Sequence, residues 1–220
     1  MSGLSPRFRG DAGGPIRYRL GRGGHVTPED VVVQRLTESA RTKERLLETQ
    51  QAAIVSAGRV LAEAVGAGKK VLWCGNGGSA ADSQHLSTEL VVRLSGEFER
   101  PAVASLALTT DTSLLTACAN DYSFAQIFAR QVEALGQPGD VLVGITTSGN
   151  SPNVLAALEE AGRRGLKRVL LSAGEGGACV AHADAAVLVP SAVTSHIQEC
   201  HIAVGHVLCE LVERLACGRG

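Results

Sequence analysis

The chain has 220 residues, of which 45% are hydrophobic, and this is the size of one large domain with a sizeable core. Its 21 Lys and Arg residues nearly cancel its 22 Asp and Glu residues, so no overall basic field exists to hold nucleic acid or an anionic membrane. No apolar run approaches the roughly 18 residues of a membrane span. The six cysteines form no CxxC pair, which indicates reduced thiols. We therefore expect a cytoplasmic protein with a small-molecule or protein partner.

The N-terminal segment is rich in Gly and Arg and has no apolar periodicity. Such a segment buries too little apolar surface to offset the entropy lost on ordering. We expect a flexible tail over residues 1–26 and one domain over residues 27–220. The arginines of the tail could touch an acidic partner, but composition favours a solvated extension.

A long helix is predicted from Thr27 to about residue 67. The stretch Thr-Pro-Glu-Asp supplies a capping hydroxyl, a proline at the first helical position and acids at the positive end of the helix dipole. The sequence does not decide whether this helix is broken near Thr49. Six apolar positions recur at helical spacing, namely Val32, Leu36, Ile54, Ala57, Leu61 and Val65. They predict a buried stripe, and the helix could also pack on a second subunit.

Five short apolar runs follow, at residues 71–74, 102–106, 141–145, 168–172 and 185–189. Helical patterns separate or follow them, at residues 80–92, 111–119, 124–135, 152–163 and 196–216. Short, nearly continuous apolar runs spaced by helices indicate parallel strands that are covered on both faces. The predicted fold is an α/β protein, a three-layer α/β/α sandwich with a five-stranded parallel sheet and a long N-terminal helix.

Two loops rich in Gly and hydroxyl residues follow predicted strands and open helices. Residues 75–79 read Gly-Asn-Gly-Gly-Ser, and residues 146–151 read Thr-Thr-Ser-Gly-Asn-Ser. Free backbone N–H groups and the helix dipole favour an anion at such positions, beyond the carboxyl ends of the strands. Neither loop has the lysine of GxxxxGKS or the full GxGxxG spacing, which argues against a nucleotide. Each loop alone could be an ordinary turn, but two in one sheet favour a phosphate.

Polar residues on two helices are candidates for a site. His85 and Glu89 lie four residues apart, on one face of the helix after the first loop. The C-terminal helix carries Gln198, His201 and His206. At 100° per residue, Gln198 and His206 are about 80° apart and can share a site, whereas His201 and His206 are about 140° apart. One of the two histidines should face elsewhere, and spacing alone does not decide which.

From about residue 30 to its end, the chain resembles the sugar isomerase (SIS) domain family, and within it the isomerases of seven-carbon sugar phosphates. Four stretches carry the resemblance: CGNGGSAADSQHLSTEL at 74–90, ACAND at 117–121, PGDVLVGITTSGNSPNV at 138–154 and IQECHIAVGH at 197–206. The resemblance implies an aldose–ketose isomerase that converts D-sedoheptulose 7-phosphate to D-glycero-D-manno-heptose 7-phosphate through an enediol(ate). This would be the first step of nucleotide-activated heptose biosynthesis.

The resemblance also implies residue roles. The expected substrate-binding residues, in which the hydroxyls of the second loop hold the phosphate, are Asn76, Gly77, Gly78, Ser79, Glu89, Asn120, Asp121, Thr146, Thr147, Ser148, Ser151 and Gln198. The expected ligands of a divalent metal, usually zinc, are His85, Glu89, Gln198 and His206. Glu89 is the expected base and His206 the expected acid, which leaves His201 structural. Ser195 stands where these isomerases often carry an aspartate, so a substrate contact or a proton-transfer helper could differ here.

The resemblance and the apolar faces of the first and last helices predict a homotetramer with sites at subunit interfaces, where His206 could complete a neighbour's pocket. Two alternatives stay open. One is a related tetrameric adaptor that binds the replication initiator DnaA, but it lacks the catalytic Glu and the final His, which this chain has as Glu89 and His206. The other is an isomerase of another sugar phosphate, although such relatives lack this arrangement of His, Glu and Gln.

Overall fold

The computed structural model describes residues 26–218 of the chain. The tail predicted over residues 1–26 lies, except for Val26, outside the described residues. The described residues divide into two compact units between Glu38 and Ser39, and the sheet belongs to the second. Among the described residues, no helix is both long enough and apolar enough to cross a membrane.

The first helix, α1 (Pro28–Gly66), begins at the predicted cap. The Thr27 hydroxyl accepts a hydrogen bond from the Asp30 N–H (3.1 Å), and the Asp30 carboxylate accepts one from the Thr27 N–H (3.0 Å). This reciprocal pair is a capping box. α1 is unbroken at Thr49, whose hydroxyl donates to the Arg45 carbonyl one turn earlier (2.7 Å).

Of the six predicted positions, only the four in the second half of α1 pack in the core. Ala57 and Leu61 are fully buried, and Val65 packs against the same core cluster. Val32 and Leu36 are 57% and 68% exposed, so the prediction is wrong at these two positions. Helical periodicity shows which side chains share a face, but it does not show whether a single chain covers that face.

Five parallel strands form one sheet in the order β2-β1-β3-β4-β5. Their bounds are β1 (Val71–Gly75), β2 (Ser105–Ala107), β3 (Val141–Ile145), β4 (Lys167–Ala173) and β5 (Ala185–Val189). Successive residues of a strand point to opposite faces. Val71 and Trp73 accordingly join one core cluster, while Leu72 and Cys74 join the other. The sheet is therefore buried on both faces, as predicted.

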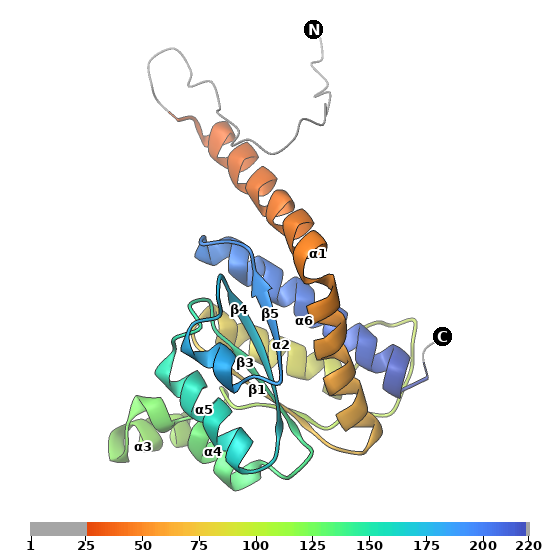
Figure 1. Ribbon diagram of the computed structural model, residues 1–220, viewed down its shortest axis with the longest axis vertical. Coiled ribbons are helices and arrows are strands. Elements are labelled where there is room, and N and C mark those ends of the chain that lie inside the picture. The colour runs from red at the N-terminus through yellow and green to blue at the C-terminus, as the bar shows by residue number, and fades with distance from the viewer. Residues whose placement is uncertain (1–25, 219–220) are drawn as a thin grey trace, which may run out of the picture. The chain divides into compact units, whose positions relative to one another are not determined.

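Helices cover the two faces of the sheet (Figure 1). Besides α1 they are α2 (Gly78–Val91), α3 (Thr112–Asp121), α4 (Ala129–Leu135), α5 (Pro152–Arg163) and α6 (Thr194–Ala216), with two 3₁₀ turns, η1 (Phe124–Gln126) and η2 (Ala178–His182). α1, α2 and α6 bury side chains in one core cluster, and α3, α4 and α5 bury theirs in the other. This confirms the three-layer α/β/α sandwich and places α2 and α6 on the same face.

Two predicted elements differ from the structure. The strand expected at residues 102–106 is the short edge strand β2, because the Val103 N–H donates to the Leu90 carbonyl at the end of α2 and not to a strand. The helix expected at residues 124–135 is split into η1 and α4. A single helix would place Phe124 and Phe128 on one face, whereas Phe124 is 61% exposed and Phe128 is buried.

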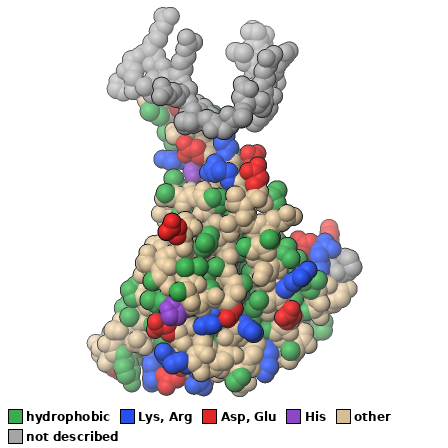
Figure 2. Space-filling model, in the orientation of Figure 1, with side chains coloured by type: hydrophobic (Ala, Val, Ile, Leu, Met, Phe, Trp, Pro, Cys, Tyr) green, Lys and Arg blue, Asp and Glu red, His purple; other side chains and the backbone are tan. Residues whose placement is uncertain are grey.

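The surface carries both signs of charge. Acidic and basic side chains are interspersed on the face that Figure 2 shows, in keeping with the balanced composition. Large apolar side chains are also exposed in the single chain, among them Val91, Val92, Val207 and Leu215, on or next to α2 and α6. A contiguous patch of such side chains would be typical of a surface that packs on a partner.

The six cysteines are free thiols, and five of them are buried. Burial raises the pKa of the Cys179 thiol to about 11 and that of Cys209 to about 12, so the reactive thiolate is scarce near neutral pH. We expect only the partly buried Cys217 to react readily with a chromogenic disulfide reagent in the native protein, and all six thiols to react after unfolding. Several fast-reacting thiols in the native protein would contradict this burial.

Candidate active site

Two loops lie at the point where the strand order reverses. β1 lies between β2 and β3, so the chain leaves β1 toward one side of the sheet and later returns on the other. α2 follows β1 and α5 follows β3, and these helices pack on opposite faces. Ligands of open α/β sheets bind at such a switch point, beyond the carboxyl ends of the strands. The glycine loop (residues 75–79) and the hydroxyl loop (residues 146–151) both occupy this position.

A pair of amide side chains joins the glycine loop to the start of α5, next to the hydroxyl loop. The Asn76 Nδ2 donates to the Asn153 Oδ1 and the Asn153 Nδ2 donates to the Asn76 Oδ1, both at 2.8 Å. Asn153 is 1% exposed, and its Oδ1 also accepts from the Val154 N–H. The pair fixes the glycine loop against the start of α5. Asn153 is not among the predicted site residues, because its sequence neighbourhood does not reveal a partner 77 positions away.

The hydroxyl loop presents donors suited to a phosphate. Thr146 is buried, and its Oγ1 lies 2.9 Å from the Ser151 Oγ. Thr147 is half-buried and Ser148 is exposed. Ser151 immediately precedes α5, whose first position is Pro152. The first N–H groups of a helix have no partners within it and favour an anion, so the loop offers N–H and hydroxyl donors without a cationic side chain.

A segment after β4 holds the hydroxyl loop in shape. Gly149 has a φ of +68°, and a Cβ there would lie 2.0 Å from the Gly176 carbonyl oxygen, so only glycine fits. The Gly149 carbonyl accepts from the Cys179 N–H (2.9 Å), and the Asn150 Oδ1 accepts from the Ala178 N–H (2.9 Å). These contacts fix the backbone conformation of the hydroxyl loop.

Three predicted metal ligands meet where α2 and α6 pack together. The ligand atoms of His85, Glu89 and His206 all lie within 4.8 Å of one another, and all three residues come from one chain. The two histidine Nε2 atoms are 2.8 Å apart, and the His85 Nε2 lies 3.4 Å from the Glu89 Oε1. Two imidazoles and a carboxylate are a donor set that zinc accepts. The residues present therefore fit the predicted metal.

Close approach of α2 and α6 depends on two glycines. A Cβ added at Gly205 would lie 2.4 Å from the Leu86 Cδ1, and one added at Gly78 would lie 2.5 Å from the Gln198 Nε2. The Gln198 amide thus lies against the first residue of α2, at the glycine loop. Gly205 precedes His206 and Leu86 follows His85, so the same contact brings the two histidines together.

His201 lies against the sheet and not in the cluster. It is 1% exposed, and its Nε2 donates to the Ser172 carbonyl of β4 (3.0 Å). Burial lowers the pKa of His201, so this imidazole is neutral at pH 7. Helical spacing required that one of the two histidines face elsewhere, and that histidine is His201.

Some predicted positions are not joined to the cluster by a hydrogen bond among the described residues. Asn120 and Asp121 are exposed at the end of α3, where the Asn120 Nδ2 donates to the Asp121 Oδ1 (2.9 Å). Ser195 is exposed in the first turn of α6. Their contact with a substrate stays a prediction.

Asp82 is a polar neighbour of the cluster that the sequence pattern did not single out. It precedes His85 by three residues on α2, and its Oδ2 is buried with no hydrogen-bond partner among the described residues. Burial raises the pKa of its carboxyl, against the opposite influence of His85. Its only signal in the sequence is the spacing of three residues, which is common on helices.

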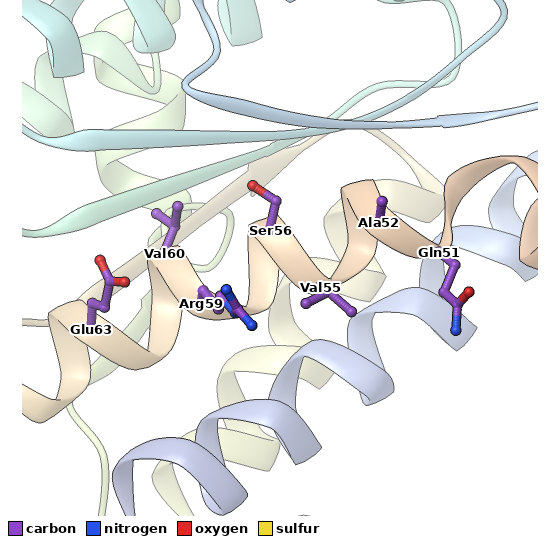
Figure 3. Close-up of a pocket in the computed structure, with 7 residues that line it drawn as sticks. All are labelled: Gln51, Ala52, Val55, Ser56, Arg59, Val60 and Glu63. Atoms are coloured by element: carbon purple, nitrogen blue, oxygen red, sulfur yellow. The ribbon is translucent and has the colours of Figure 1, made fainter.

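A groove on α1 is a separate feature (Figure 3). It has a volume of about 490 Å³ and is lined by Gln51, Ala52, Val55, Ser56, Arg59, Val60 and Glu63, all from one helix. None of these residues belongs to the two loops or to the cluster. The groove therefore lacks the groups that the predicted chemistry needs.

Comparison with known proteins gives a consistent result. The model of the SIS domain family matches residues 36–173. A phosphoheptose isomerase from Chlorobaculum tepidum is 51% identical over 87% of this chain and 92% of its own length. One from Paramagnetospirillum magneticum is 57% identical over 70% of this chain and 79% of its own length.

Comparison with solved structures gives the same result as comparison of the sequences. A phosphoheptose isomerase from Neisseria gonorrhoeae superposes with a TM-score of 0.80 and 40% identity, and the match covers 86% of this chain and 100% of that one. One from Francisella tularensis has a TM-score of 0.82 and 37% identity, with the same coverage. Both the sequence and the fold of this chain are thus similar to these isomerases along most of their length.

Proposed function

The chain belongs to the SIS domain family, and from this premise we propose that it isomerises D-sedoheptulose 7-phosphate to D-glycero-D-manno-heptose 7-phosphate. The observation that carries the proposal is that His85 and Glu89, on the helix that the glycine loop opens, meet His206 of α6. Relatives that are 51% and 50% identical over more than four fifths of the chain are phosphoheptose isomerases. We place the reaction at the first step of nucleotide-activated heptose biosynthesis.

The reaction needs one group that moves a proton between C1 and C2 and a second group that moves a proton between O1 and O2. We assign the first role to Glu89, whose side chain is 17% exposed. Its carboxylate takes a proton from C1 while His206 gives a proton to O2, which leaves an enediol. His206 then takes the proton of O1 as Glu89 returns its proton to C2, and the aldose forms.

We propose that His85, Glu89, Gln198 and His206 hold a divalent cation, and that this cation is zinc, which accepts mixed nitrogen and oxygen ligands. When bound, zinc supplies Lewis-acid stabilisation of the charge that develops on the sugar oxygens. A carboxylate is a weaker base when it binds a cation, so the two roles of Glu89 oppose one another.

The hydroxyl loop is the proposed phosphate site, through Thr146, Thr147, Ser148 and Ser151. The proposed contacts of the sugar are Asn76, Gly77, Gly78, Ser79, Asn120, Asp121 and Gln198. The Asn76 to Asn153 pair supports this assignment, because it holds the glycine loop against the start of α5, which directly follows the hydroxyl loop. Residues 27–220 form the SIS domain in this proposal, and residues 1–26 form a tail.

Replacing Ser148 with Ala is expected to weaken substrate binding, because Ser148 is exposed in the hydroxyl loop and offers a donor to the phosphate. A hydrogen bond to a charged group contributes about 1.5–3 kcal/mol, so KM should rise about 10- to 100-fold. Steady-state kinetics measures this. Ser113→Ala, at an exposed serine of α3, is the control and should leave KM unchanged. An unchanged KM in Ser148→Ala would contradict the assignment.

The chain is proposed to work as a homotetramer with sites at subunit interfaces. Val207 is 44% exposed next to His206, and the His85 side chain is 49% exposed, so the cluster borders apolar surface that a neighbouring subunit could cover. Light scattering tests this, and a monomer would contradict it. We also place the protein in the cytoplasm, where free thiols such as these six stay reduced.

A panel of sugar phosphates tests the function. Zinc-loaded protein should isomerise sedoheptulose 7-phosphate faster than hexulose or pentulose phosphates, and chelation should abolish the activity until zinc is restored. Preference for a shorter sugar would favour the other sugar-phosphate isomerases. No turnover together with capture of DnaA would favour the adaptor.

A further inference from the structure

We propose that Arg100 and Glu213 act as a positioning pair, which holds the turn of α2 that carries Glu89 in register with the turn of α6 that carries His206. Both side chains of the pair are 0% exposed. Arg100 lies between α2 and β2, and Glu213 lies on α6. Glu213 follows His206 by seven residues, so the two lie on nearly the same face of α6.

The guanidinium of Arg100 binds both helices at once. Its Nε donates to the Glu213 Oε1 (3.0 Å). Its Nη2 donates to the backbone carbonyl of Glu89 (2.7 Å), and its Nη1 donates to that of Leu90 (2.8 Å). Carbonyls in the last turn of a helix have no partner within it, and a cation there is favoured by the helix dipole. One side chain therefore links the backbone of Glu89 to α6.

A second contact sets the distance between the helices. Gly205 meets Leu86 on the cluster's side of α2, and the Arg100–Glu213 pair fixes the end of α2. Glu89 lies between these two points, and Arg100 holds its carbonyl and that of the next residue, Leu90. Reacting groups that are misplaced by about 1 Å can cost about 100-fold in rate. A change in the Arg100–Glu213 pair should therefore shift Glu89 relative to His206.

Stability alone is a weaker explanation of the pair. A buried ion pair often contributes no more than well-packed apolar residues of the same volume, because both charges lose their hydration. Arginine also provides donors in fixed directions for the Glu213 carboxylate and for the carbonyls of Glu89, Leu90 and Pro101, which a single lysine ammonium cannot match. The arrangement thus suits a pair that fixes the position of α2 relative to α6.

Two conservative variants test the pair. Arg100→Lys keeps the charge opposite Glu213 but loses the forked donors. Arg168→Lys is the matched control, since the Arg168 Nε and Nη2 both donate to Asp184 (3.1 and 2.8 Å) at the amino end of β4 and β5. Zinc affinity is measured by competition with a chromogenic chelator, and kcat and KM are measured with sedoheptulose 7-phosphate.

The inference rests on the proposed function, and the expected results separate the two. Arg100→Lys should raise the zinc dissociation constant about 10- to 100-fold and lower kcat, while KM stays unchanged because the hydroxyl loop is untouched. Arg168→Lys should leave the zinc dissociation constant and kcat at wild-type values. A folded Arg100→Lys protein with wild-type zinc affinity and kcat would overturn the positioning role. Wild-type protein that neither binds zinc nor isomerises the sugar would overturn the proposed function and this inference with it.

A double variant covers the case in which Arg100→Lys does not fold. Arg100→Met/Glu213→Leu removes both buried charges together, an exchange that other proteins tolerate. The folded double variant should show the same loss of zinc affinity and kcat at an unchanged KM. If it keeps wild-type values, or if neither variant folds, the pair is structural and the inference is wrong.

Discussion

Replacing Glu89 with Gln is expected to lower kcat by roughly 10²- to 10⁴-fold, the range that one general base contributes. Gln has nearly the shape of Glu but cannot accept a proton from carbon. The fold should survive, because the Glu89 carbonyl, not its carboxylate, accepts the hydrogen bond from Arg100. The kinetics are measured at saturating zinc, so that a weaker metal site does not imitate the loss of the base.

Glu210→Gln is the matched control for this change. Glu210 lies on the same helix as His206, and its carboxylate accepts from Arg214 (2.8 Å) on the partly exposed side of α6. Its replacement should leave kcat unchanged. Normal turnover in a folded, zinc-saturated Glu89→Gln protein would remove Glu89 from the chemistry.

Replacing Gly205 with Ala is expected to destabilise the fold by about 1–3 kcal/mol, the usual effect of overpacking. The new Cβ would lie 2.4 and 2.5 Å from the Cδ1 and Cδ2 of Leu86, which is fully buried. α2 and α6 would have to separate, and His85 would separate from His206. Urea unfolding should show the loss of stability, and a zinc titration should show weaker binding.

Gly66→Ala separates this effect from the general consequence of placing Ala in a helix. Gly66 ends α1, and the nearest atom to an added Cβ is 4.0 Å away. The change should leave zinc binding unaltered and should raise the free energy of unfolding by less than about 1 kcal/mol. Equal zinc affinity in Gly205→Ala and wild-type protein would contradict the role given to the α2–α6 contact.

The buried strands were predictable because both faces of the sheet are covered. Residues 141–145 read as an uninterrupted apolar run, and they form β3 with the same bounds. The edge strand was harder to place, because the segment before β2 donates a backbone hydrogen bond to the Leu90 carbonyl of α2. Val32 and Leu36 have the helical periodicity of a core face and yet are exposed in the single chain. Periodicity contains no information about what covers a face.

The candidate site was likewise predictable from the sequence only in part. His85 and Glu89 could be grouped from the sequence because they are one helical turn apart, and Gln198 and His206 could be paired by their angle on α6. The contacts that hold these groups in place involve residues distant in the chain, such as Asn153 and Arg100 with their partners on other elements. Such pairings are formed by the packing of separate elements, so no local pattern indicates them.

The central claim is that this site transfers a proton between C1 and C2 of sedoheptulose 7-phosphate. Its most direct test is to incubate zinc-loaded protein with the sugar phosphate in D₂O and follow the products by NMR. The account predicts an aldoheptose 7-phosphate that carries deuterium at C2, because the proton held by Glu89 exchanges with the solvent, and it predicts that product and label form at least about 100-fold more slowly with Glu89→Gln. Folded, zinc-loaded wild-type protein that binds the sugar phosphate but forms no aldose would contradict it.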